Sequence, residues 1–164
     1  MRSKGCQPVG FEKRNVTIKT EMQMELDEII YSAITADQTL AAECSCIKST
    51  CIEVPPTEED NTPLPYIIIA EEASQNDQGT KDNVWESDVD VVNVGVIISA
   101  NSPKEVKRLR RLVRRAVGSY VESMYGETPN LRTLSMDGIT WDWTKPCYYD
   151  TLHYQCDMDV NLDE

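Results

Sequence analysis

The strongest structural signal in the sequence is the start of a helix at Ser102. Serine is a favoured N-cap, Pro103 suits the first helical position, and Glu105 completes a capping box. Apolar side chains then recur at helical spacing until Gly126, a residue type that commonly ends helices. The apolar positions are Val106, Leu109, Val113, Ala116, Val117, Tyr120 and Met124. Such a helix buries only one of its sides, so a second layer of structure is expected to cover that side.

The second layer is predicted to be a β-sheet. Residues 66–70 form a continuous apolar run of strand length, and 84–99 are rich in valine and isoleucine. Apolar and polar side chains alternate over 139–143 and again over 147–162, the pattern of antiparallel strands that pack on one side. A shift of the apolar phase within 84–99, just before Gly95, also predicts a β-bulge.

The first third of the chain predicts helices and a loop. A capping box at Thr20 precedes apolar residues at helical spacing, so an amphipathic helix of about four turns is expected there. Asp37 offers a cap for a short run over 38–43, and 46–54 favours a strand or an extended segment. Four prolines in 54–65 exclude a regular strand and predict an exposed loop.

Together these elements predict an α+β fold, with an antiparallel sheet of about four strands and two helices packed on one face. A length of 164 residues with 40% hydrophobic content suits a single core. We therefore expect an N-terminal extension over 1–19 and one domain over 20–164. The sequence has no signal-peptide h-region and no run of eighteen apolar residues, which predicts an aqueous, intracellular setting without a membrane.

Cysteine and histidine are placed unfavourably for a metal centre. Cys44, Cys46 and Cys51 could supply most of a zinc shell, but no CxxC pair occurs and His153, the single histidine, is distant in sequence. Without an export signal, the six cysteines are expected to remain free thiols. We expect no metal and no cofactor.

Catalytic motifs of the common hydrolase, nucleotide-binding and zinc-protease classes are absent from the sequence. His153 falls on the polar side of a predicted strand, so we expect no catalytic residue and no enzymatic activity. One enzyme alternative stays open, because carboxylates of neighbouring strands can hold Mg²⁺ for phosphodiester cleavage. The acids concerned are Asp137, Asp142, Asp150, Asp157 and Asp159. Their alternation with apolar residues favours a solvated strand face instead.

The helix that begins at Ser102 also concentrates positive charge. Seven of the sixteen basic residues are Lys104, Lys107, Arg108, Arg110, Arg111, Arg114 and Arg115. Elsewhere nine basic residues stand against twenty-seven acidic ones, within a net charge of −12. Like charges three or four residues apart weaken an isolated helix by roughly a few tenths of a kcal/mol per pair. This cost favours a binding partner over a merely solvated helix face.

A basic stripe on an acidic body is electrostatically self-complementary. We therefore predict a subunit interface, with the acidic surface of a neighbouring copy as the favoured partner and DNA phosphate as the second. The predicted interface residues are Lys104, Lys107, Arg108, Arg111, Arg114 and Arg115. The strongly negative remainder of the chain opposes binding of a nucleic-acid backbone by the whole surface, so the partners are expected to be proteins.

The polar stretch 73–83 predicts a long hairpin arm between two strands. Its length and polarity suit a segment that becomes ordered when a partner binds. The residues predicted to bind that partner are Gln75, Asn76, Asp77, Gln78 and Lys81.

Several of these segments occur in an order typical of one family. A helix ends in the run Ile30-Tyr31-Ser-Ala-Ile34-Thr-Ala-Asp37-Gln-Thr-Leu40, and a proline-rich loop leads through Pro65-Tyr66 into an apolar strand. A polar hairpin and a strand that leads into a capped helix follow. Over roughly 22–124 this order resembles phage tail-terminator and related head-to-tail completion proteins. The basic N-terminal stretch and the long C-terminal strand lie outside the resemblance.

The resemblance implies a small α/β subunit without catalytic residues that forms a ring, typically a hexamer. Such a ring terminates the tail or connects neck rings at the head–tail junction of the virion, after assembly in the host cytoplasm. Its partners would be further copies and neighbouring adaptor, stopper or tail-tube proteins, with DNA only as cargo passing through. The alternatives are the metal-dependent nuclease described above and a small phage-encoded module that binds a host protein.

Overall fold

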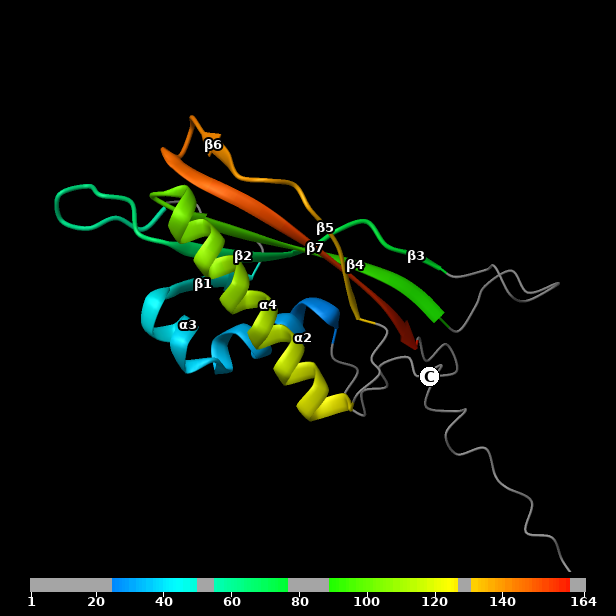
Figure 1. Cartoon of the computed structure of the whole chain (residues 1–164). Helices are drawn as coiled ribbons and strands as arrows, with labels where there is room; N and C mark the ends of the chain where they lie inside the picture. The colour runs from blue at the N-terminus through cyan, green and yellow to red at the C-terminus, as the bar shows by residue number, and fades with distance from the viewer. Residues whose placement is uncertain (1–24, 50–54, 77–88, 127–130, 160–164) are drawn as a thin grey trace, which may run out of the picture.

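A mixed β-sheet forms one layer of the protein and helices form the other (Figure 1). The computed structural model describes residues 25–49, 55–76, 89–126 and 131–159. Within these ranges the strands are β1 (Cys46–Ser49), β2 (Tyr66–Glu71), β3 (Gln75–Asn76), β4 (Val89–Ala100), β5 (Arg132–Met136), β6 (Thr140–Asp142) and β7 (Cys147–Asp159). The helices are α2 (Leu26–Ala36), α3 (Gln38–Glu43) and α4 (Pro103–Tyr125). No helix in the described ranges combines the length and apolarity needed to cross a membrane.

The long strands β4 and β7 pair along their whole length and form the centre of the sheet. The order across the sheet is β1-β2-β4-β7-β5, and the short strands β3 and β6 pair with β4 and β7 beyond the ends of β2 and β5. All pairings are antiparallel except that of β1 with β2, which is parallel. The α+β class is therefore confirmed, but the described sheet is mixed and has seven strands, not about four antiparallel ones.

The short strand predicted over 139–143 is present as β6, and it pairs with β7. The strands beyond the predicted four are β1, β3 and β5, and the last two lack clear sequence signals. β3 has only two residues, and in β5 the register shifts between Thr133 and Ser135. The bulge predicted near Gly95 is wrong, because β4 pairs with both β2 and β7 without a register shift. Apolar residues on both faces of β4 produced the apparent change of phase: Val92 is buried toward the helices, whereas Val91 lies on the opposite face.

Side-chain caps begin α3 and α4 where the sequence predicts them. The Oδ1 atom of Asp37 accepts a hydrogen bond from the backbone N–H of Leu40 at 2.9 Å. The Oγ atom of Ser102 accepts one from the backbone N–H of Glu105 at 3.2 Å. Gly126 ends α4 with a φ of 91°, a conformation that favours glycine. Both predicted ends of α4 are thereby confirmed.

The helical layer contains three described helices, whereas the predicted fold counted two. The third is α3, the short run over 38–43 for which Asp37 was the expected cap, and it packs beside α2 and α4. α2 begins at Leu26, after a capping box in which Glu25 and Glu28 exchange side-chain and backbone hydrogen bonds. The cap predicted at Thr20 and the extension over 1–19 lie outside the described residues.

Alternate residues of the central strands point toward the helices and fill one core. In β7, Leu152, Tyr154 and Cys156 are buried, as the alternation predicts. From α4 the predicted apolar positions are buried or half-buried, except that Met124 is 60% exposed and Val121 is buried in its place near the end of the helix. α2, β2 and β4 supply most of the remaining core side chains.

The strand register places three connections at the same end of the sheet. Tyr66, the first residue of β2, pairs with Ser99, and Tyr148 near the start of β7 pairs with Ala100. The loop 55–65, the turn between β6 and β7, and the start of α4 therefore lie together at this end. We call it the loop end of the sheet.

A buried ion pair connects the helical layer to the sheet. Asp150 of β7 is 0% exposed, and its Oδ2 atom lies 2.6 Å from a guanidinium nitrogen of Arg110 in α4. Its Oδ1 atom accepts a hydrogen bond from the backbone N–H of Gly138, in the connection between β5 and β6, at 2.9 Å. One carboxylate thus joins three separate elements.

We expect Asp150→Ala to lower the free energy of unfolding by about 3–5 kcal/mol, because it leaves the Arg110 guanidinium without its partner at a partly buried position. The matched control is Asp157→Ala, which removes an acid of the same strand whose ion pair with Arg132 is long, at 3.8 Å, and partly exposed. That change should cost below about 1 kcal/mol. Urea denaturation of both variants measures the difference, and equal losses would contradict the role given to Asp150.

Candidate interaction surfaces

The outer side of α4 carries the predicted subunit interface. All six predicted residues are exposed: Lys104, Lys107, Arg108, Arg111, Arg114 and Arg115. Arg110 belongs to the same run in sequence but not to this surface, because it turns inward to Asp150. At about 100° per residue, Lys104, Arg111 and Arg115 lie within about 40° of one another around the helix axis. We call these three residues the basic face of α4.

The members of the predicted interface differ in their contacts within the chain. Arg108 forms an ion pair with Glu43 at the end of α3. Arg114 lies close enough to Tyr154 to lower the pKa of that phenol, although burial is the larger influence and raises the pKa to about 12. By contrast, no acid of the described chain lies within 4.0 Å of the basic face. These three cations are therefore available to a partner.

Two lysines lie near the N-terminal end of α4, where positive charge is unfavourable for an isolated helix. The N-terminal end of a helix carries a partial positive charge, so cations in the first turns are destabilising. Lys104 and Lys107 lie there, and α4 has no basic residue in its last turn, where cations would be favourable. Helix stability therefore does not explain why positive charge gathers in this half of α4.

The predicted arm is described only at its base. Gln75 and Asn76 form β3 and pair with Val91 and Asp90 of β4. The Asn76 side chain donates a hydrogen bond to Asp90 Oδ1 at 2.8 Å, which holds this end of the segment against the sheet. The other three arm residues, Asp77, Gln78 and Lys81, lie outside the described residues.

Four of the five acids of the nuclease alternative have described side chains, and each of these has its own local contacts. Asp137 bonds to His153, Asp150 to Arg110, and Asp157 lies near Arg132. Asp142 accepts hydrogen bonds from the turn that follows it, and these bonds lower its pKa. The side chain of Asp159 lies outside the described part of the protein. Among the described residues, no three histidine, cysteine or acidic side chains are grouped so as to hold a metal ion.

The cysteines described by the structure are free thiols. They are Cys44, Cys46, Cys147 and Cys156. Burial raises the pKa of Cys44 to about 11, and a thiol of this kind is unreactive at neutral pH. Cys51, the third member of the zinc alternative, lies outside the described residues.

A histidine cluster that was not predicted from the sequence lies on the face of the sheet opposite the helices. His153 Nδ1 lies 2.8 Å from Glu72 Oε1, and its Nε2 atom lies 2.8 Å from Asp137 Oδ1. The Glu72 carboxylate rests over Gly95, the β4 partner of His153, where a Cβ atom would approach Glu72 Oε1 to 2.4 Å. Because the two carboxylates bind opposite sides of the imidazole, the cluster ties neighbouring segments together and offers no shared metal position.

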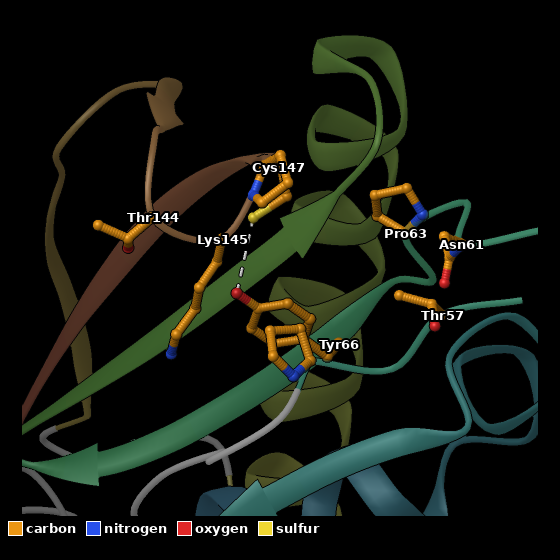
Figure 2. Close-up of a pocket in the computed structure, with 9 residues that line it drawn as sticks. Thr57, Asn61, Pro63, Tyr66, Thr144, Lys145 and Cys147 are labelled. Atoms are coloured by element: carbon orange, nitrogen blue, oxygen red, sulfur yellow. Dashed lines mark hydrogen bonds between the residues drawn. The ribbon is translucent and has the colours of Figure 1, made fainter.

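A cavity of about 460 Å³ opens at the loop end of the sheet (Figure 2). Its walls come from the loop 55–65 and from the start of β7, and they are mostly apolar. The lining residues are Pro55, Thr57, Asn61, Pro63, Tyr66, Thr144, Lys145, Pro146 and Cys147. The Tyr66 hydroxyl and the Cys147 sulfur lie 3.6 Å apart, and burial raises the pKa of Tyr66 to about 12. The Tyr66 phenol is therefore not ionised at neutral pH and does not provide a base.

Trp143 projects from the turn between β6 and β7 at the same end. It is 87% exposed, although the alternating pattern placed it on the covered side of a strand. The strand ends at Asp142, whose carboxylate accepts hydrogen bonds from the backbone N–H and the hydroxyl of Thr144 and so holds the turn. Trp141 contacts Trp143 edge-to-face, with ring centroids 6.1 Å apart. Tryptophan is enriched among the residues that dominate the binding energy of protein interfaces, so this turn is a candidate contact for a protein partner.

Comparison with protein-family models and with curated proteins finds no match to the chain. Functional inference therefore depends on the surfaces of the chain itself. Three stand out: the basic face of α4, the turn that carries Trp143, and the loop 55–65.

We expect the stabilising effect of His153 to depend on pH. Partial burial lowers its pKa, but hydrogen bonds to Glu72 and Asp137 outweigh this effect and raise the pKa above its usual value of 6.5. The stabilisation should therefore be complete below pH 6.5 and be lost as the pH rises through the folded-state pKa. The measurement compares urea unfolding of the wild type and His153→Gln from pH 6 to pH 9. The free energy of unfolding of the wild type should exceed that of the variant by a margin that declines by up to about 1 kcal/mol over this pH range. A margin that does not change with pH would contradict the ion pairs.

Replacing Trp143 by Phe should remove more iodide-quenchable fluorescence than replacing Trp141, because only the Trp143 ring is largely open to solvent. The change at Trp143 should alter the free energy of unfolding by less than about 0.5 kcal/mol, as is usual for surface substitutions. Quenching titrations and urea curves of the two single variants provide the measurement. Equal loss of quenchable emission in both variants would show that Trp143 is covered in solution.

Proposed function

We propose that this chain is a non-enzymatic structural protein of a tailed-phage virion. In this proposal its copies form a ring at the head–tail junction, which terminates the tail or connects neck rings. Neighbouring adaptor, stopper or tail-tube proteins are its other partners, and DNA passes through the ring as cargo. The protein acts by assembling with other proteins.

The observation that carries the proposal is the basic face of α4. Lys104, Arg111 and Arg115 are exposed, lie on one side of a well-capped helix, and have no acidic partner in the described chain. The remainder of the chain is strongly acidic. A second copy therefore offers a surface of opposite charge, and repeated contacts between unlike surfaces close into rings when the rotation permits.

The arrangement of the resembling segments adds support. The run from Ile30 to Leu40 lies in α2 and α3, and the Pro65-Tyr66 pair leads directly into β2. These elements pack in the same core as α4. The segments that resemble head-to-tail completion proteins are thus part of the domain that presents the basic face.

The nuclease alternative is less well supported by the geometry. Two-metal and one-metal phosphodiesterases require carboxylates that converge on one position. Here Asp137, Asp150 and Asp157 each contact a different histidine or arginine. Mg²⁺- or Mn²⁺-dependent cleavage of duplex DNA by the purified protein would favour this alternative over ring assembly.

We expect wild-type protein to form rings whose population rises with concentration, and the variant K104E/R111E/R115E to sediment as smaller species. Three exposed charge reversals replace attraction by repulsion at the interface, but each costs folding less than about 1 kcal/mol. Wild-type rings should also loosen near 1 M salt, where the Debye length is about 3 Å. Analytical ultracentrifugation at low and high salt measures both effects.

The matched control is K104R/R111K/R115K, which keeps every charge and should sediment like the wild type. Circular dichroism verifies that all three proteins are folded. Identical sedimentation of the charge-reversed variant and the wild type at both salt concentrations would refute the interface. A filter-binding assay with duplex DNA would then test DNA phosphate as the ligand of the basic face.

A further inference from the structure

The loop 55–65 is an ordered projection at the loop end of the sheet. Figure 1 shows it extending away from the sheet and the helices. Its two sides are joined by a bridge between Thr57 and Pro63 and by a hydrogen bond from the Leu64 N–H to the Pro56 carbonyl at 3.0 Å. Asn61 turns the chain at the tip with a φ of 65°. These contacts give the loop a defined conformation.

The tip of this loop carries three consecutive acids. Glu58, Glu59 and Asp60 are all exposed, and we call them the acidic tip. Within the described chain, no lysine, arginine or histidine lies within 4.0 Å of the acidic tip. Asp60 also has an internal role, because its Oδ1 atom accepts the backbone N–H of Thr62 at 3.0 Å. The carboxylates of Glu58 and Glu59 form no such hydrogen bond with a described residue and are exposed to solvent.

We infer that the acidic tip of one copy docks on the basic face of α4 of the next copy. The inference rests on the proposed ring and names the surfaces that meet in it. Both surfaces belong to one chain, have opposite charge, and lack an ion-pair partner among the described residues. Because they are different patches, the contact is head-to-tail, which is the type that generates rings.

The dimensions of the two surfaces agree. Arg111 and Arg115 are one helical turn apart, which separates them by about 6 Å along the axis. Glu58 and Glu59 are adjacent, so their α-carbons are about 3.8 Å apart and their side chains can diverge to two neighbouring cations. The loop projects beyond the body of its own subunit, so that its tip can approach a neighbour without a change in the fold.

An intramolecular contact does not account for these charges. The loop is fixed at both sides by the Thr57–Pro63 bridge and the Leu64–Pro56 bond, and its tip makes no ion pair with α4 of its own chain. α4 binds two described acids of the same chain: Asp150 pairs with Arg110 on its inner side, and Glu43 pairs with Arg108 beside the basic face. The basic face is left to an outside partner.

The test is a charge swap between matched pairs. One variant carries Glu58→Arg and Glu59→Arg, which leaves the Asp60 hydrogen bond intact, and the other carries Arg111→Glu and Arg115→Glu. Each should raise the protein concentration at half-assembly by at least about tenfold, because two attractive contacts become repulsive. The variant with all four changes should return to within about threefold of the wild type. Glu71→Arg, at the far end of β2, serves as a control and should assemble normally.

Sedimentation equilibrium of the five proteins separates the outcomes. Restored assembly in the fourfold variant supports the contact. If the helix variant fails to assemble but the loop variant assembles like the wild type, the acidic tip is not the partner and this inference is overturned, while the ring remains. The same holds if the fourfold variant is not rescued although circular dichroism shows it folded. A wild type that stays monomeric at every concentration would instead refute the ring itself.

Discussion

The ion pair between Asp150 and Arg110 determines how the helical layer meets the sheet. A buried carboxylate is costly unless hydrogen bonds satisfy it, and here Arg110 and the Gly138 N–H do so. Arg110 lies on the flank of α4, so the pair fixes the rotation of the helix about its axis. With that rotation Val113 and Val117 face the core, and Arg111 and Arg115 face outward.

The elements predicted correctly from the sequence are those whose signals are local. α4 has caps at both ends and one apolar side, and β7 alternates over most of its length. β5 was missed because a register shift breaks its alternation and because Leu134 and Met136 are exposed. The parallel pairing of β1 was missed for another reason: parallel neighbours are joined through distant connections, and no local pattern records which strand lies beside which.

Contacts between distant residues limited the prediction of the surfaces in the same way. The basic face could be located because its residues share one helix. Arg110 belongs to the same basic run but was not among the predicted interface residues, and its ion pair with Asp150, forty residues later, could not be predicted from the sequence. The cluster around His153 depends on Glu72 and Asp137, which reach it from separate segments, and on Gly95, whose missing side chain leaves room for a carboxylate. Such a cluster becomes visible only when the strand register is known.

The distribution of charge has a consequence for assembly that does not depend on any single contact. Lys104 and Lys107 near the N-terminal end of α4 oppose the helix dipole, and the basic residues of the helix repel one another, so the isolated chain is less stable than it would be with the same residues elsewhere. In the proposed ring, an acidic surface of a neighbouring copy would offset both penalties at once. Under that proposal, stability lost in the isolated chain is recovered on association, and the recovery diminishes as salt screens the charges.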